Sequence, residues 1–378
     1  MVPTINFERN FMFCRNIYVE NFRNIASADV DFCEGVNVLI GDNAQGKTNL
    51  VEAIYTTALG KSFRQGSDKD IIKFGEEYCF VKNKYFDGLR DSEISMRIFS
   101  DRRPKRVEQN NMRVSRTSEM VGSFKIVIFC PEHLSLIKEG PALRRGFLDV
   151  AISQIRPLYL KSLQRYSNIL KQRNALIKTG EEDRATFNAT IDLFSDQLAH
   201  EAAIITNYRV NYIKELKSHV SSCFCDMMGD SEIPTLEYLS SSKLTEEECF
   251  DIEACEEAYR RLYLSHHDRE IGAGATLWGI HKDDIEIYLN RNRARFFASQ
   301  GQQRSLSLAL KLAEGEIIKS ECGDYPVFLF DDVLSELDAG RRSYLLSSIK
   351  DKQVVLTCCE KNDIVADRLI RVKGGVFS

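Results

Sequence analysis

One short segment near the N-terminus constrains the fold more than any other part of the chain. The β-branched apolar run at residues 36–40 (VNVLI) leads into GDNAQGKT and then into NLVEAIYTTAL, which has helical spacing. This order, strand, G-x-x-x-x-G-K-T, helix, is that of a phosphate-binding loop (P-loop), in which glycines let backbone N–H groups point at phosphate oxygens. The start of the following helix adds a positive dipole end. The alternative, an accidental glycine turn before a helix, is disfavoured by the match of the whole segment.

The P-loop predicts how a nucleoside triphosphate is held. We expect Lys47 to neutralise the β and γ phosphates and Thr48 to hold Mg²⁺ through its hydroxyl. The predicted nucleotide-binding residues are Gly41, Asp42, Asn43, Ala44, Gln45, Gly46, Lys47, Thr48 and Asn49. Taken alone, the motif indicates a nucleoside triphosphate and no particular reaction.

A second candidate for the same site lies near the other end of the chain. The apolar run at residues 326–330 (PVFLF) is typical of a buried strand and stops at Asp331 and Asp332. Carboxylates at the C-terminal edge of a parallel strand lie where doubly wound sheets bind ligands. We predict that Asp331 is a direct or outer-sphere partner of Mg²⁺ and that Asp332 polarises the attacking water. A strand capped by turn-forming acids is the alternative, which the P-loop makes less favoured.

Between these segments lies a small polar turn, residues 297–304 (FASQGQQR), followed by a helical pattern. Ser299 stands at the cap position of that helix, so the turn is a second anion-binding helix start. Plain capping would explain an isolated turn of this kind, but its place upstream of the acidic strand favours a nucleotide contact. The predicted binding residues here are Ser299, Gln300, Gly301 and Gln302.

The order of these motifs resembles the ABC ATPase head, with residues 299–302 in the signature position and residues 335–338 (SELD) in the D-loop position. In that family the signature of one subunit caps the γ-phosphate held by the P-loop of another. The resemblance therefore implies a head-to-tail homodimer that ATP closes, with Lys47, Ser299, Asp331 and Asp332 as catalytic residues.

Further segments point to one branch of these heads. Residues 17–24 (IYVENFRN) resemble the first strand of DNA-repair and chromosome-maintenance heads. From about Phe13 to the C-terminus the chain resembles the RecF family of DNA replication and repair proteins, in register and in order, at residues 52–55, 60–64, 129–134, 144–149, 170–174 and 279–284. This resemblance implies binding of double-stranded DNA near single-strand gaps and help in loading recombinase with RecO and RecR.

The chain departs from the family pattern at several positions. The first dozen residues are an extension, and Met12 is a second candidate start. Gln45 replaces a small residue, and the run VVLTCCE (354–360) has no histidine where transporter ATPases place their switch histidine. Glu132 is the candidate for the Q-loop role. Asp332 replaces the usual catalytic glutamate, which predicts slow hydrolysis.

Helical periodicity from about residue 158 to residue 225 predicts an inserted arm of two long antiparallel helices, with a break at Thr179-Gly180. We interpret its aromatic stripe as core packing between the helices. The predicted division is residues 1–130 for the first part of the ATPase head, 131–270 for the inserted helical lobe, and 271–378 for the last part of the head.

Composition limits where the protein works and what it binds. The formal net charge of −4 excludes a generally basic surface, so a DNA site has to be a local patch. No run approaches the ~20 apolar residues that a membrane span needs, and the 11 cysteines are scattered. These features predict a cytoplasmic protein with reduced thiols and no membrane partner, in which Cys223 and Cys225 are packing residues.

A basic run at residues 101–106 (DRRPKR) falls in an expected hairpin turn, where long cations can reach phosphates without reading bases. A solvated loop is the common alternative for such a run. Arg113, Arg116, Arg144 and Arg145 add charge, and the predicted DNA contacts are Lys61, Arg64, Arg102, Arg103, Lys105 and Arg106.

The sequence thus predicts an α/β ABC-type ATPase head assembled from both chain ends, with an inserted, mainly helical second lobe. We expect a weak, DNA-stimulated ATPase whose ATP-bound dimer binds DNA. Two alternatives stay open: a chromosome-organising head in which nucleotide only scaffolds assembly, and a transporter ATPase subunit.

Overall fold

Four strongly apolar runs from distant parts of the sequence form the parallel core of the head. The computed structural model describes residues 11–180, 182–229, 231–359 and 364–378, so most of the predicted N-terminal extension lies outside the described residues. Strands β3 (Val36–Ile40), β8 (Ile126–Phe129), β12 (Val327–Asp331) and β13 (Val354–Cys358) are buried almost throughout, as strands covered on both faces must be. The sheet order is β15-β14-β3-β13-β12-β8, with β14 (Arg368–Lys373) also parallel and β15 (Val376–Phe377) antiparallel.

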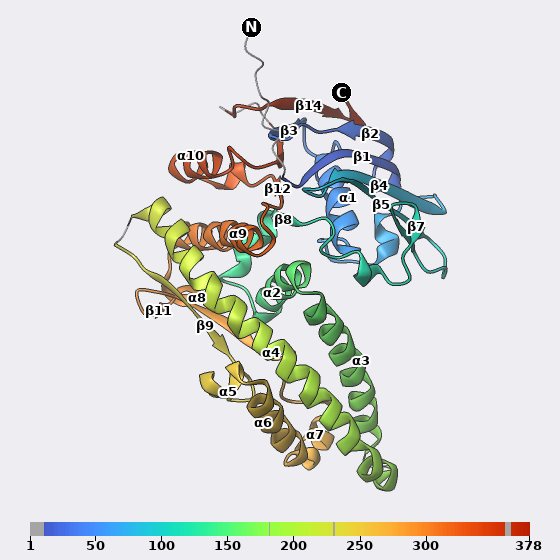
Figure 1. Ribbon diagram of the computed structural model, residues 1–378, viewed down its shortest axis with the longest axis vertical. Coiled ribbons are helices and arrows are strands. Elements are labelled where there is room, and N and C mark those ends of the chain that lie inside the picture. Colours follow the sequence, from blue (N-terminus) through green and yellow to red (C-terminus); the bar gives the residue numbers. More distant parts are fainter. Residues whose placement is uncertain (1–10, 181, 230, 360–363) are drawn as a thin grey trace. The chain divides into compact units, whose positions relative to one another are not determined.

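The sheet order explains how the two chain ends build one head. N-terminal β3 pairs with C-terminal β13 on one side and β14 on the other, in the upper part of Figure 1. The predicted α/β head assembled from both ends is therefore confirmed.

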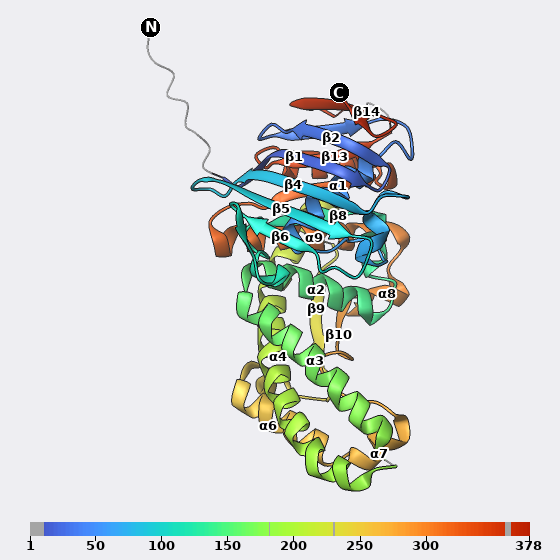
Figure 2. The ribbon, with the colours of Figure 1, turned by 90° about the vertical axis from the view of Figure 1, so that its right-hand side faces the viewer.

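A second, antiparallel sheet has the order β2-β1-β4-β5-β6-β7, and its strands lie side by side in Figure 2. Its strands are β1 (Phe13–Phe22), β2 (Ile25–Asp31), β4 (Tyr78–Phe86), β5 (Asp91–Phe99), β6 (Arg106–Gln109) and β7 (Met112–Arg113). Helix α1 (Lys47–Leu59) contacts strands of both sheets and is buried on nearly every side from Leu50 onward. The helix that starts at the P-loop is thus fixed by packing on two faces.

The chain divides into two compact units. The head unit comprises residues 1–134 and 314–378, and the helical lobe comprises residues 135–313. By compactness, residues 271–313, which the predicted division places in the head, cluster with the lobe instead. Helix α9 (Gln300–Cys322) begins next to Ser299 in the lobe and ends in the head unit, because the boundary between the two units, at residues 313 and 314, falls inside it.

Two long helices dominate the lobe, α3 (Pro157–Thr179) and α4 (Arg184–Met228), which run beside each other in Figures 1 and 2. They confirm the predicted arm and its break after Thr179. The aromatic stripe packs in the core as predicted: Tyr159, Tyr166, Phe187 and Tyr212 are buried, whereas Leu163, Leu170 and Phe194 are half-buried. The rest of the lobe consists of α2 (Pro141–Ile155), β9 (Pro234–Leu239), α5 (Glu246–Phe250), α6 (Ile252–Leu264), α7 (His267–Ala273), β10 (Asp284–Leu289), β11 (Asn292–Arg293) and α8 (Ala294–Phe297).

Among the described residues, each helix is either too short or too polar to cross a lipid bilayer.

Candidate nucleotide-binding site and surrounding charges

The P-loop forms a concave cradle at the carboxyl edge of the parallel sheet. Gly46 has a φ of 113°, and a side chain on Gly41 would clash with the Val372 carbonyl, because an added Cβ would lie 2.2 Å from its oxygen. Both positions therefore need glycine. The pocket has a volume of about 410 Å³ and is lined by Asn24, Asn43, Ala44, Gln45, Gly46, Lys47, Thr48, Asn49, Arg64, Asp332 and Thr357.

Two predicted residues from opposite ends of the sequence meet in this cradle. Thr48 Oγ1 donates a hydrogen bond of 2.8 Å to Asp331 Oδ1, and Thr357 Oγ1 donates one of 2.9 Å to the same oxygen. Asp331 is buried, and burial raises the pKa of its carboxyl, whereas the two hydroxyl donors lower it. A hydroxyl and a carboxylate oxygen in contact suit Mg²⁺, which prefers hard oxygen ligands.

Lys47 is buried beneath the loop. Its Nζ donates to the carbonyl oxygens of Gly41 at 2.5 Å and Asp42 at 2.8 Å. Carbonyl oxygens are weaker partners for an ammonium group than phosphate oxygens are, because charge-assisted hydrogen bonds are roughly twice as strong as neutral ones. A bound triphosphate would therefore compete well for Lys47.

Asp332 lies at the rim of the same pocket, held by its own loop. Its backbone N–H donates to Thr357 Oγ1 at 2.9 Å, and the Ser335 hydroxyl donates to its carbonyl oxygen at 2.8 Å. The residue has a φ of 52°, a conformation that non-glycine residues rarely adopt. The predicted D-loop serine thus supports the carboxylate that the sequence assigns to water activation.

The structure places Arg64, a predicted DNA contact, at the nucleotide cradle. Its side chain is 33% exposed and donates to Asn49 Oδ1 at 3.0 Å. It also pairs with the fully buried Glu52 of α1 at 3.3 Å, and Arg23 makes two bonds to the same carboxylate, at 2.6 and 3.1 Å. Glu52 therefore fixes two cations beside the P-loop helix.

The sequence analysis missed three residues that line or brace the cradle, namely Arg23, Asn24 and Thr357. Asn24 donates to the Ala44 carbonyl at 3.1 Å and accepts from Asn49 Nδ2 at 2.7 Å. Its only sequence signal was its place in the IYVENFRN segment. Thr357 reaches the cradle because β13 pairs between β3 and β12, a pairing of distant segments that no local pattern predicts.

Two departures from the family pattern have local explanations. Gln45 Oε1 accepts from the Gly374 N–H at 2.5 Å, and its carbonyl accepts from the Gly375 N–H at 2.8 Å, so the longer side chain ties the C-terminal hairpin to the loop. Cys359 lies just past β13, with Sγ 3.8 Å from Lys47 Nζ and 3.0 Å from Asn43 Oδ1. Glu132 is exposed in the short 3₁₀ turn Pro131–Leu136 and is not among the described residues that line the pocket.

The signature residues lie in the helical lobe at the start of α9. The Gln302 N–H donates to Ser299 Oγ at 3.2 Å, and the Ser299 N–H donates to Gln302 Oε1 at 2.7 Å, which is a reciprocal capping box. Gln302 Nε2 also donates to Glu232 Oε1. Ser299 and Gln300 are exposed, Gly301 and Gln302 half-exposed, so this helix start is open to a ligand.

The remaining predicted DNA contacts gather around the turn between β5 and β6, which is the expected hairpin. Arg102, Arg103 and Arg106 are exposed there, and the Arg103 guanidinium lies 4.2 Å from the Phe99 ring and bonds Asp101. Lys105 is half-buried, since its Nζ donates to the Gly60 carbonyl at 2.6 Å and to Asp68 at 2.8 Å. This contact brings the turn to the segment that carries exposed Lys61.

Two arginines that the sequence suggested as extra DNA charge are structural instead. Arg144 is 3% exposed and makes two bonds of 2.8 Å to Asp284, as well as bonds to the Leu136 and Glu139 carbonyls. Arg145 donates to the Asp283 carbonyl at 2.8 Å. Within the lobe these cations are used for internal pairing.

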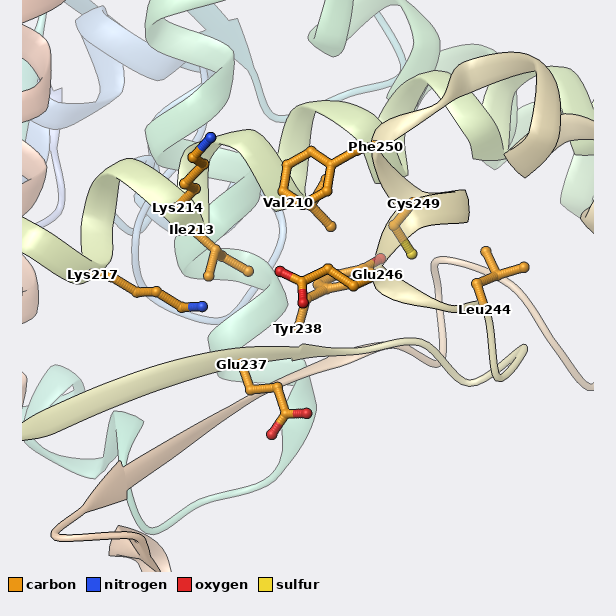
Figure 3. A pocket seen from close by; sticks show the side chains of 10 residues that line it. All are labelled: Val210, Ile213, Lys214, Lys217, Glu237, Tyr238, Leu244, Glu246, Cys249 and Phe250. Atoms are coloured by element: carbon orange, nitrogen blue, oxygen red, sulfur yellow. The ribbon is translucent and has the colours of Figure 1, made fainter.

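The lobe also contains a cavity of about 340 Å³ between α4, β9 and α5 (Figure 3). It is lined by Val210, Ile213, Lys214, Lys217, Glu237, Tyr238, Leu244, Glu246, Cys249 and Phe250. Figure 3 shows lysine and glutamate side chains on facing elements, with apolar side chains between them. The P-loop cradle, by contrast, presents glycine-rich backbone and cations, which suit the phosphate groups of a nucleotide.

The comparisons with known proteins agree with this geometry. A family model for the RecF/RecN/SMC N terminal domain matches residues 13–375. The chain is 39% identical over 336 residues to the DNA replication and repair protein RecF of Staphylococcus carnosus, covering 89% of this chain and 90% of the relative. It is 37% identical over 370 residues to that of Geobacillus kaustophilus, covering 96% and 98%.

Solved structures give the same picture. The structure of the recombination mediator protein RecF-ATPrS in the RecFOR pathway is similar to this chain with a TM-score of 0.91 and 34% identity, over 97% of this chain and 98% of the other. A Pyrococcus furiosus Smc head domain is similar with a TM-score of 0.56 and 16% identity, over 97% and 96%, a likeness of fold alone.

Proposed function

The chain belongs to the RecF family, and from this premise we propose that it is an ATP-dependent DNA-binding protein of recombinational repair and replication-fork maintenance. It acts in the cytoplasm, binds double-stranded DNA near single-strand gaps, and promotes recombinase loading with RecO and RecR. The relative solved with a nucleotide is described as a recombination mediator of the RecFOR pathway, which supports this assignment.

One observation carries the nucleotide part of the proposal: the hydrogen bond between Thr48 and Asp331. It joins the P-loop helix to the end of the acidic strand and leaves two oxygen ligands side by side. Mg²⁺, when bound there, would neutralise phosphate charge and orient the triphosphate. Lys47 then grips the β and γ phosphates with its ammonium group, and the P-loop amides hold the remaining oxygens.

Hydrolysis requires a water molecule aligned with the γ-phosphate. Asp332 orients this water and accepts its proton, braced by the bond from Ser335 to its carbonyl oxygen. Aspartate is one methylene shorter than glutamate, so its carboxylate reaches less far toward the water and turnover is slow. Slow turnover suits a switch in which ATP occupancy, more than its rate of consumption, sets the state of the protein.

The second half of each catalytic site comes from another copy. Ser299 and the start of α9 present an exposed hydroxyl and the positive end of a helix dipole, and the proposal places them on the γ-phosphate held by Lys47 of a second copy. ATP therefore joins two copies head to tail at two sites. Closure brings the exposed cations of the β5–β6 turn and Lys61 of both copies around one duplex.

The test compares the wild-type protein with Lys47→Met. Sedimentation velocity gives the oligomeric state, and fluorescence anisotropy gives the affinity for gapped duplex DNA, each with and without ATP. We expect ATP to produce a dimer and tighter DNA binding in the wild-type protein alone. If ATP changes neither the oligomeric state nor the DNA affinity of either protein, the ATP-closed dimer around DNA is rejected.

A phosphate-release assay separates an ATPase from a scaffold. Gapped DNA should raise the slow release rate of the wild-type protein severalfold. If DNA leaves the rate at its basal level, the chromosome-organising alternative, in which nucleotide only holds the assembly together, is the better description.

A further inference from the structure

Two adjacent phenylalanines beside the signature are exposed to solvent in the isolated chain. Phe296 is 65% exposed and Phe297 is 74% exposed, at the end of the short helix α8. Isolated exposed apolar side chains are common, but two neighbouring aromatic rings at one place are typical of an interaction surface. We call Phe296 and Phe297 the aromatic ledge.

The aromatic ledge is attached rigidly to the signature. Gln303 Nε2 donates to the Ala298 carbonyl at 2.9 Å, so the first turn of α9 holds the residue that joins the ledge to Ser299. The capping box then fixes Ser299 itself. At the other end, Ala294 is buried and anchors the start of α8.

A buried carboxylate orients the ledge further. Glu286 of β10 is 3% exposed and pairs with Arg295 at 3.1 Å. The Arg295 guanidinium also lies 4.6 Å from the centre of the Phe296 ring, which covers one face of that ring. Among the described residues, the cation–ring contacts include none to Phe297, which is the more exposed of the two rings.

We infer that the aromatic ledge is part of the dimer interface and packs against the cradle-bearing face of a second copy of this chain when ATP is bound. This inference rests on the proposed function, which puts Ser299 on the partner copy's γ-phosphate. Consecutive Cα atoms are about 3.8 Å apart, so Phe297 cannot lie more than about 8 Å from Ser299 in Cα position. A ring this close to the proposed contact lies within reach of the partner copy.

The area involved is sizeable for a nucleotide-dependent dimer. With two copies of each ring, the ledge offers on the order of 500 Å² of apolar surface, about a third of the ~1,600 Å² that a stable interface buries. The signature, the nucleotide and the polar rim supply the remainder. The ledge therefore explains why ATP can close the dimer without a permanent apolar interface.

The experiment measures dimer dissociation constants by sedimentation in the presence of a slowly hydrolysed ATP analogue. The variant is Phe296→Ala/Phe297→Ala, and the matched control is Phe74→Ala, which removes a fully exposed phenylalanine of the head unit. We expect the ledge variant to dimerise at least tenfold more weakly and the control to match the wild-type protein. Binding of a fluorescent ATP analogue to the dilute monomer should be unchanged in all three proteins.

A spectroscopic readout avoids any question of folding. The chain already contains Trp278, so the emission of Phe297→Trp is compared with that of the wild-type protein. Adding the ATP analogue should shift the extra emission to shorter wavelength, in step with dimer formation. No shift during dimer formation overturns the inference, as does equal dimerisation of the ledge variant and the wild-type protein. Loss of DNA affinity without loss of dimer would assign the ledge to DNA and overturn it too. If the wild-type protein itself fails to dimerise with nucleotide, the proposed function fails instead.

Discussion

Two buried arginines of the helical lobe and the exposed arginines of the β5–β6 turn in the head unit lie in opposite environments. In the lobe, Arg173 and Arg209 are at most 1% exposed, and each donates to a carboxylate, Glu270 at 2.6 Å and Asp149 at 2.9 Å. Buried charge of this kind is tolerated only when it is paired and hydrogen-bonded. The two arginines therefore stabilise the packing of the lobe and are not available to a ligand.

In the head unit, the comparable cations face solvent or a pocket. Arg102 and Arg106 are exposed on the β5–β6 turn, and Arg64 lines the nucleotide cradle. The difference shows that folding decides which charges remain available to a ligand, whatever the number of charges in a segment.

The largest expected effect is on the stability of the lobe. Arg173 donates to Ser195, Thr276 and Glu270, so Arg173→Met leaves the fully buried Glu270 carboxylate without its main partner. Removing one member of a buried pair costs about 3–5 kcal/mol, which urea denaturation followed by circular dichroism will measure. ATP affinity at the cradle should change less than about twofold.

Arg165→Met is the matched control on the same helix α3. Its side chain is 66% exposed and lies 3.4 Å from Glu201, so its loss should cost at most about 1 kcal/mol. Equal destabilisation by the two variants would contradict a structural role for the buried arginines. Removing both partners, in Arg173→Met/Glu270→Met, should recover part of the loss because no lone charge is then buried.

In the head unit, Asp331→Asn should reduce ATP hydrolysis much more than ATP binding. The amide can still accept from Thr48 and Thr357, but it lacks the negative charge that Mg²⁺ needs. We expect phosphate release to fall about 100-fold or more, whereas ATP binding without Mg²⁺ stays within about threefold. Unchanged turnover would move the metal site away from Asp331.

The parts of this architecture that the sequence could predict are local. The P-loop, the strand before Asp331 and the capped turn at Ser299 each consist of neighbouring residues, and the structure has the element expected at each. The two arm helices follow from a spacing that repeats over many turns. Local sequence patterns thus predicted the P-loop, the end of the acidic strand and the capped helix start.

The rest depends on pairings between distant segments. Thr357 reaches Asp331 only because β13 inserts between β3 and β12, and Arg64 reaches the cradle through the buried Glu52. The GIHKDD segment (279–284) was noted for its family likeness, yet in the structure it supplies Asp284 to Arg144 and the Ile280 carbonyl to Arg209. A pattern in one sequence does not distinguish a charged residue that is paired inside the fold from one that remains exposed.

A third prediction uses a buried histidine of the lobe. His281 contacts the Tyr166 hydroxyl at 2.7 Å, and burial lowers the pKa of its imidazole to about 4. In the unfolded chain the imidazole takes up a proton near pH 6.5, whereas the folded protein does not until about pH 4. His281 therefore contributes stability above pH 6.5 that is lost as the pH falls toward 4.

His281→Gln keeps a hydrogen-bonding group but cannot titrate. Its unfolding free energy should fall less steeply than that of the wild-type protein between pH 6.5 and 4.5, by about 1–2 kcal/mol over that range. At pH 8 the imidazole is neutral in both states, so the difference between the two proteins there gives the pH-independent cost of the substitution. Parallel curves at all pH values would show that His281 takes up its proton equally in the folded and unfolded states.

The smallest expected effect concerns DNA. Arg102→Ala/Arg106→Ala removes two exposed guanidinium groups, whereas Lys105, bound to Gly60 and Asp68, is left in place to preserve the turn. Each phosphate contact contributes about 0.9 to the slope of log affinity against log salt, so the slope should fall by roughly 2 and affinity near physiological salt about fivefold. Fluorescence anisotropy with gapped duplex DNA across a salt series measures both quantities.

The comparison between the units supplies the control for this experiment. Arg165→Ala/Arg184→Ala removes the same formal charge from the lobe, where Arg165 and Arg184 pair with Glu201 and Asp268. If only the total charge of the protein mattered, the two double variants would lose DNA affinity equally. A cation that is already paired with a carboxylate releases fewer counterions from DNA than an unpaired cation does. If only the variant of the β5–β6 turn loses DNA affinity, the pairing of each arginine in the folded protein therefore determines whether it contacts phosphate.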